Sequence, residues 1–384
     1  MGPARFAISD PSQQTWWFIL ILILAILITI RPNKEIVLSK NTTLELKGFA
    51  ILAVVFGHIG FFLSQDDRFL FPLSIFAGVG VNLFLFLSGF GLTRSAKARP
   101  FTIWSFYRDH APKLFVPLWI VLSVLFMGDT FLGIHYPWET VVQSFLGYFP
   151  RADLAENVNA PLWYFTLILA YYLVFPLVYI KKLPLASALI IGVLGYIAAE
   201  QILPLNPSVL DPDVLILYRL HIWAFPLGML LAAAIQRPYQ LKLKHTVSLA
   251  TFRLLSASVV CLFIAWLSLN AGVGQGVWIE QKNSLVLMLC VIGVFLLKPF
   301  DVLFFRLFGR YSYELYLLHW PMMYRYDLYF FWLPASLATW AHLFTGIGLG
   351  ALSKKRSLHP SDADHRSRAK KVQKQVIRGV FPIS

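Results

Sequence analysis

The chain has few charged residues and almost no cysteine. Only 14% of its 384 residues are Asp, Glu, Lys or Arg, whereas soluble domains contain about 25%. Its two cysteines, Cys261 and Cys290, both lie in apolar runs, which excludes a disulfide framework. The sequence contains no CxxC, no HExxH and no glycine-rich phosphate loop. It therefore predicts no metal site and no nucleotide-binding fold.

Apolar side chains are abundant instead. They make up 58% of the chain, and the mean hydropathy is +0.66. Apolar segments of spanning length fall at 16–31, 46–64, 73–93, 114–132, 161–180, 184–203, 214–236, 252–270, 283–299, 311–332 and 334–352. The sequence therefore predicts an all-α, polytopic transmembrane helix bundle of about 11 spans.

The net charge of +14 is spread between the apolar runs, which favours orientation signals over nucleic-acid binding. Most basic residues fall in alternate connections, so the positive-inside rule predicts an inner or plasma membrane protein with its N-terminus outside and its C-terminus in the cytoplasm. We expect an extra span and inner linker over 1–39 and a membrane domain over 40–352. The basic tail over 353–384 is predicted to be cytoplasmic and disordered.

The segment KGFAILAVVFGH places Lys47 near the start of an apolar helix and His58 about halfway along it. Eleven positions return to nearly the same helix face, and the two groups are about 16 Å apart along the axis. If Lys47 lies at a membrane surface, His58 lies near the midplane, where an ionisable side chain indicates a functional site. The alternative is a buried structural histidine bonded to a neighbouring helix.

Two further segments supply polar groups at membrane depth. In GRYSYELYLLHWP, the residues Ser312, Tyr316 and His319 share one helix face. A second histidine at comparable depth predicts one central polar chamber. In GVGVNLFLFLSGFGLTRS, the glycines indicate close packing or approach by a ligand, and Asn82 and Ser88 are candidate chamber-lining groups. Asn82, Ser88 and Tyr316 are also candidate oxyanion donors.

A basic, aromatic-containing inner loop follows, from Arg94 to Lys113 and including Arg108. Its cations are compatible with a grip on a phosphorylated ligand such as a nucleotide-bearing coenzyme. Placement by the positive-inside rule explains them equally well.

In order along the chain, these segments resemble signatures of the acyltransferase type three integral-membrane family. The matching stretches are KGFAILAVVFGH, GVNLFLFLSGF, FYRDHAPKLFVP, PLWYFTLILAYYLVFPL and YSYELYLLHWP, and the resemblance runs from about residue 40 to 350. Two departures stand out. Many members carry arginine where this chain has Lys47, and Asp109–Pro112 interrupts a segment that is often consecutively basic.

The resemblance implies a ten-helix acyltransferase core, with the first span as an addition. It implies an O-acyltransferase that moves an acyl group, with acetyl as the commonest default, from cytoplasmic acyl-CoA to a hydroxyl of a surface carbohydrate or glycolipid. Acyl-CoA is then a co-substrate, and no cofactor is expected. His58 carries over as base or acyl relay with Lys47 as its companion, and Arg94, Arg108 and Lys113 as coenzyme-phosphate ligands.

A transporter or flippase for a lipid-linked glycan is the alternative function. It would use the same polar chamber without breaking a bond. A non-catalytic membrane scaffold is a third class, for which Lys47 and His58 would both be dispensable.

Overall fold

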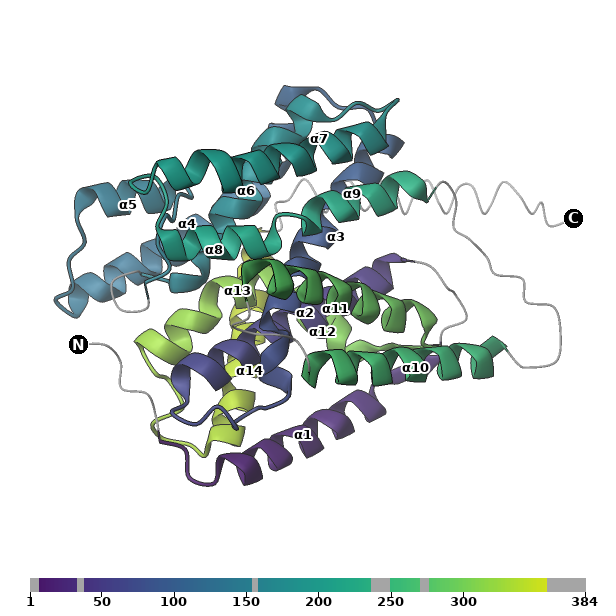
Figure 1. The fold of residues 1–384 in the computed structure, drawn as a ribbon. Helices are drawn as coiled ribbons and strands as arrows, with labels where there is room; N and C mark the ends of the chain where they lie inside the picture. Colours follow the sequence, from purple (N-terminus) through teal and green to yellow (C-terminus); the bar gives the residue numbers. More distant parts are fainter. Residues whose placement is uncertain (1–6, 33–37, 154–157, 236–248, 270–275, 358–384) are drawn as a thin grey trace, which may run out of the picture.

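The computed structural model describes residues 7–32, 38–153, 158–235, 249–269 and 276–357, which form a helix bundle (Figure 1). The first half comprises α1 (Pro11–Ile28), β1 (Ile30–Pro32), α2 (Lys40–His58), α3 (Ala77–Ala98), α4 (Ile103–Phe131), α5 (Trp138–Phe145), α6 (Trp163–Val178) and α7 (Pro184–Ile197). The second half comprises α8 (Pro212–His221), α9 (Ala224–Ala234), α10 (Leu249–Leu269), α11 (Val277–Leu297), β2 (Phe300–Val302), α12 (Leu303–Arg310), α13 (Ser312–Trp320) and α14 (Ala335–Ser357).

The predicted all-α, polytopic architecture is confirmed. Within the described ranges, nine helical segments are long and apolar enough to cross a membrane. They coincide with nine of the expected spans. The expected span 252–270 falls in α10, whose apolar stretch Thr251–Ile264 is shorter. The expected span 311–332 consists of α13 and a π-helical turn that ends at Arg325.

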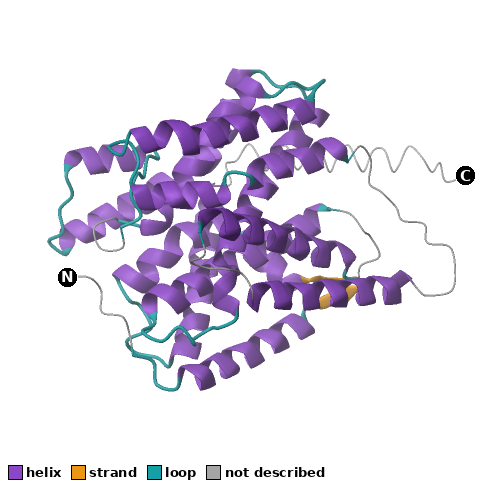
Figure 2. Cartoon of the chain, in the orientation of Figure 1, coloured by secondary structure: helices purple, strands orange, loops and turns teal. Residues whose placement is uncertain are grey.

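The first span packs against the outside of the bundle. Phe18 of α1 stacks on Trp340 of α14 at 4.8 Å between ring centroids and meets the ring of Phe56 of α2 edge-on. Beyond α1, β1 pairs with β2 in a short antiparallel ladder, shown in orange in Figure 2, with Arg31 opposite Asp301. At the other end, α14 continues to Ser357, past the predicted start of the tail. The rest of that tail lies outside the described residues.

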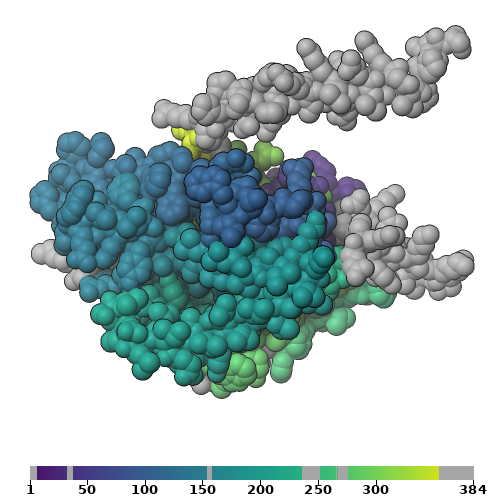
Figure 3. Space-filling view, turned by 90° about the horizontal axis from the view of Figure 1, so that it is seen from above, coloured from purple at the N-terminus to yellow at the C-terminus, as the bar shows by residue number. Residues whose placement is uncertain are grey.

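Two clusters of buried apolar side chains form the core. One is built mainly by α3, α6, α7, α8, α9 and α11, and the other by α1, α4, α12, α13 and α14. Helix α2 contributes to both and is the most deeply buried of the candidate spans. Seen from above, the segments coloured blue and teal, α3 to α9, occupy much of the surface (Figure 3).

The basic segment after α3 is helical, so its prediction as a loop is wrong. Arg94 lies in the last turns of α3, and Arg108 and Lys113 lie in α4. Helix α4 starts early because Thr102 caps it, with side-chain and backbone hydrogen bonds exchanged with Ser105. The helix also continues through two prolines, Pro112 and Pro117.

Some basic residues near the predicted inner ends have structural partners. Lys298 is buried and forms a 2.7 Å ion pair with Glu45 of α2, whose other oxygen accepts a hydrogen bond from the backbone of Val302. Arg253 of α10 donates to the carbonyl oxygens of Leu297 and Lys298 at 2.9 and 2.7 Å. These cations therefore tie helices together in addition to any role in orientation.

Glycines allow neighbouring helices to meet backbone to backbone. A Cβ atom added at Gly48 of α2 would lie 1.8 Å from the carbonyl oxygen of Phe305 in α12, and one at Gly309 would lie 1.8 Å from that of Leu44. Gly80 of α3 also packs closely on α2, because a Cβ added there would lie 2.5 Å from the carbonyl oxygen of Ala50. Small residues permit this approach in a membrane, where apolar side chains gain little by leaving lipid.

We therefore expect Gly309→Ala to destabilise the protein. The added methyl group meets rigid backbone, so the free energy of unfolding should fall by at least about 1–3 kcal/mol. Gly91→Ala is the matched control, because no atom lies within 4 Å of its added Cβ. Thermal unfolding of both variants in detergent checks this. Equal transition temperatures would contradict the packing argument.

Candidate active site

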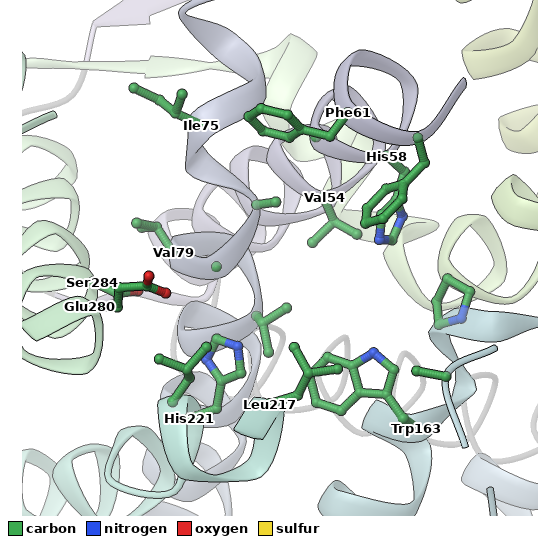
Figure 4. A pocket seen from close by; sticks show the side chains of 18 of the residues that line it. Val54, His58, Phe61, Ile75, Val79, Trp163, Leu217, His221, Glu280 and Ser284 are labelled. Atoms are coloured by element: carbon green, nitrogen blue, oxygen red, sulfur yellow. The ribbon is translucent and has the colours of Figure 1, made fainter. Parts of the chain in front are cut away.

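A cavity of about 400 Å³ lies between the two core clusters (Figure 4). Its walls come from the end of α2, the start of α3, the start of α6, the end of α8, the first turns of α11 and the end of α13. His58 and His221 lie on different walls of this cavity. Most of the lining is apolar, with a few polar side chains, as is usual for small-molecule sites.

His58 is the last residue of the 19-residue helix α2, so the prediction that it lies halfway along that helix is wrong. The helix starts at Lys40, where Ser39 caps it by accepting a hydrogen bond from the backbone of Thr42. Lys47 is thus inside the helix. It lies about 16 Å from His58 along the axis, and the described cavity lining does not include it.

The structure brings His58 and His319 together from α2 and α13. Nδ1 of His58 is 2.7 Å from Nε2 of His319, and the two rings are parallel within 7°. Nδ1 of His319 faces the carbonyl oxygens of Tyr316 and Leu315 at 2.8 and 3.1 Å. A carbonyl oxygen only accepts, so this nitrogen carries a proton.

The hydrogen bonds define the tautomers of the pair. His319 is 1% exposed, and burial in an apolar bundle favours its neutral form. Its Nε2 is then an acceptor, and the bridging proton belongs to Nδ1 of His58. The lone pair of His58 is consequently at Nε2. A nitrogen in this state can take a proton or attack an acyl group.

Local structure holds both rings in place. The α-helical hydrogen-bond pattern changes to a π-helical turn directly after His58, at Ile59–Leu63, and again at Pro321–Arg325, shortly after His319. Such turns are common at functional sites. The ring of Trp320 meets that of His58 edge-on at 5.3 Å between centroids.

The opposite wall contains a second imidazole. Nδ1 of His221 donates to Oδ1 of Asn82 at 2.8 Å, and the amide nitrogen of Asn82 donates to Oγ of Ser284 at 2.7 Å. The indole of Trp163 stacks on His221 with 5.8 Å between ring centroids. This chain orients His221 as a neutral ring with Nε2 as an acceptor.

Sequence reasoning missed most of this wall. On α11, Glu280, Asn283 and Ser284 recur at helical spacing and all line the cavity. That pattern of polar residues within an apolar span was the available signal. For His221, the signal was the same intramembrane-histidine rule that identified His58.

The other predicted site residues lie at or beyond the edges of the cavity. Asn82 is buried behind its wall, and Ser88 lies further along α3, hydrogen-bonded to Tyr172. The hydroxyl of Tyr316 donates to the carbonyl oxygen of Pro161 at 2.9 Å and so holds a lining residue. Tyr316 therefore holds part of the cavity wall in place, and its hydroxyl already donates its proton to Pro161.

The three cationic candidates are not among the described residues that line the cavity. Arg94, Arg108 and Lys113 are all exposed, and Arg108 pairs with Asp109 at 3.2 Å. Arg94 lies thirteen residues beyond Val81, the last described cavity-lining residue of α3, which corresponds to about 20 Å along the helix. The histidines at the cavity and the candidate cation Arg94 thus lie at different ends of α3.

A family model described as an acyltransferase domain matches residues 44–352. The match starts in α2 and ends in α14, so it includes every wall of the cavity and leaves out α1. No match was found among curated proteins or solved structures.

The tautomer of His58 can be tested by nuclear magnetic resonance, without an assay of enzymatic activity. In protein labelled with ¹⁵N-histidine and reconstituted in bilayers, we expect the His58 signal to show a protonated Nδ1 and an unprotonated Nε2. His319→Leu removes the acceptor, so the signal should become a mixture of tautomers, whereas His110→Ala in α4 should leave it unchanged. A protonated Nε2 in the unmodified protein would refute the assignment.

Proposed function

Because the chain belongs to the type three acyltransferase family, whose domain spans residues 44–352, we propose that it moves an acyl group from acyl-CoA to a hydroxyl of a surface carbohydrate or related acceptor. The observation that supports this proposal is the His58–His319 pair at the cavity wall. The pair leaves a basic nitrogen at the wall of a largely apolar cavity. In such a cavity, water competes little with the acceptor hydroxyl for this nitrogen.

The proposed reaction is an acyl transfer in which His58 handles one proton. Nε2 takes the proton from the acceptor hydroxyl as its oxygen attacks the thioester carbonyl. The tetrahedral intermediate then expels the coenzyme A thiolate, which receives that proton from His58. The products are an O-acyl ester and coenzyme A. If Nε2 attacks the thioester first, the coenzyme A thiolate leaves and the acyl group rests briefly on His58. The acceptor hydroxyl then displaces the imidazole from the acyl group, and the proton of the hydroxyl goes to the thiolate.

His319 supports either route as a positioning residue. Its Nε2 accepts the Nδ1 proton of His58, which holds the reactive lone pair at the opposite ring nitrogen. In serine hydrolases a carboxylate has this orienting role. A neutral imidazole tied to a backbone carbonyl does the same here without placing a charge in the membrane.

The donor is proposed to enter from the cytoplasmic side. Arg94, Arg108 and Lys113 would contact its phosphates, and Lys47 of α2 lies between this end and His58. The thioester would then reach the cavity along α3. The acceptor hydroxyl would approach from the outer side, and acetyl is the simplest acyl group for the purpose.

The decisive variant is His58→Ala. Transfer of radiolabelled acetyl from acetyl-CoA to surface glycan should fall by about 10²–10⁴-fold, because the proton acceptor is lost. His110→Ala is the control, since His110 hydrogen-bonds the carbonyl of Phe106 within α4. Undiminished transfer by His58→Ala would refute the proposed role.

A separate prediction concerns the binding of acetyl-CoA by the basic residues of α3 and α4. Arg94→Gln combined with Lys113→Gln should raise the KM for acetyl-CoA and leave kcat nearly unchanged, because only phosphate contacts are lost. Added salt should reduce the difference between variant and parent. Lys181→Gln, another exposed cation near a helix end, is the control. An unchanged KM would place the coenzyme elsewhere.

Wild-type protein in proteoliposomes separates the enzyme from the flippase alternative. Release of coenzyme A together with acylated product supports the acyltransferase. Movement of the acceptor across the bilayer without acyl-CoA supports the transporter instead.

A further inference from the structure

A second cavity, of about 610 Å³, lies beside the first. It is lined by the connection after α4, by α5, by the segment before α6, by the segment that leads into α8 and by Arg325. In Figure 1, α5 and α8 lie at the same end of the bundle. Both cavity volumes fall in the range of small-molecule sites, about 300–1,000 Å³.

The two cavities share a thin wall. Pro150 and Arg151 line the second cavity, and the next residue, Ala152, lines the first. This segment belongs to no helix or strand, and the backbone of Asp211 holds it by donating to the carbonyl oxygen of Pro150 at 3.0 Å. Consecutive residues of one segment therefore line the two cavities.

The chemistry of the second cavity differs from that of the first. Its lining is mainly polar, with the side chains of Glu139, Gln143 and Tyr148 among its donors and acceptors. Gln143 donates to Glu139 at 3.0 Å on the same face of α5, and Tyr148 donates to the carbonyl of Val209. Such groups suit a ligand whose hydroxyls both donate and accept hydrogen bonds.

The charges around the cavity favour a neutral ligand. Arg325 is paired with the buried carboxylate of Asp129 at 2.7 Å. Tyr136 also donates to that carboxylate, and burial together with this hydrogen bond raises the pKa of Tyr136, so its phenol stays neutral. The remaining lining has acidic groups as well as Arg151, which gives no excess of positive charge for a phosphate.

We propose that the second cavity binds the sugar residue next to the one that is acylated. The acceptor is then an oligosaccharide or glycan chain that extends from the first cavity across the wall at 150–152 into the second. This inference rests on the proposed function, because it assumes a hydroxyl acceptor at His58. It makes the protein selective for chain length as well as for the acylated hydroxyl.

The test is calorimetric binding to the full-length protein in nanodiscs, without acyl-CoA. The probes are the methyl glycosides of glucose, mannose and rhamnose, each paired with its trisaccharide. At least one trisaccharide should bind more tightly than its methyl glycoside. Glu139→Ala combined with Gln143→Ala should weaken that trisaccharide by about 5- to 100-fold, as expected for two lost hydrogen bonds, and leave the methyl glycoside unchanged.

Val142→Ala is the matched control, because Val142 is exposed on the same helix and is not among the described lining residues. Equal affinities for every trisaccharide and its methyl glycoside would overturn the inference. So would equal losses in the control and in the double variant. Acylation measured in parallel keeps the two ideas separate. Acyl transfer without chain-length preference refutes only the second subsite, and preferential trisaccharide binding without acyl transfer refutes only the proposed reaction.

Discussion

Helix α2 can occupy the centre of the bundle because glycines let neighbouring backbones reach it. In a membrane, apolar side chains gain little by moving from lipid to protein, so helices associate through close packing and polar contacts. Gly48 meets α12 and Gly57 meets the start of α3, where a Cβ would lie 1.8 and 2.5 Å from the nearest atoms. This packing holds α2 between the two core clusters and places its last residue, His58, at the cavity between them.

Three buried imidazoles and two buried carboxylates of this bundle differ in the kind of partner that they have. His58, His319 and His221 are joined to neutral partners, whereas Glu45 and Asp129 each meet a cation at 2.7 Å. The distinction follows from the cost of burying charge, which a partner only partly offsets. The paired charges and the neutral imidazoles also have different roles. The paired charges tie elements together near helix ends, and the neutral imidazoles leave ring nitrogens available at the cavity.

Much of the fold was predictable from the chain itself. Runs such as 46–64 and 73–93 are apolar over the length of a membrane, and that property requires no knowledge of neighbours. The segment 311–332 was overestimated because aromatic residues extend its apolar character past Arg325, where the helix has already ended. The loop expected from Arg94 to Lys113 is helical because the cap at Thr102 starts α4 early.

By itself, the sequence determined the membrane class and most of the spans, and it predicted His58 and His319 as site residues, because hydropathy and ionisable residues at membrane depth are local properties. Only the tertiary structure decided which residues face each other. It paired the two histidines, set His221 and the polar face of α11 on the opposite wall, and left Lys47 outside the cavity. The physical reason is that helix rotation and neighbours depend on contacts between distant segments, such as Gly48 with Phe305, which no local pattern encodes.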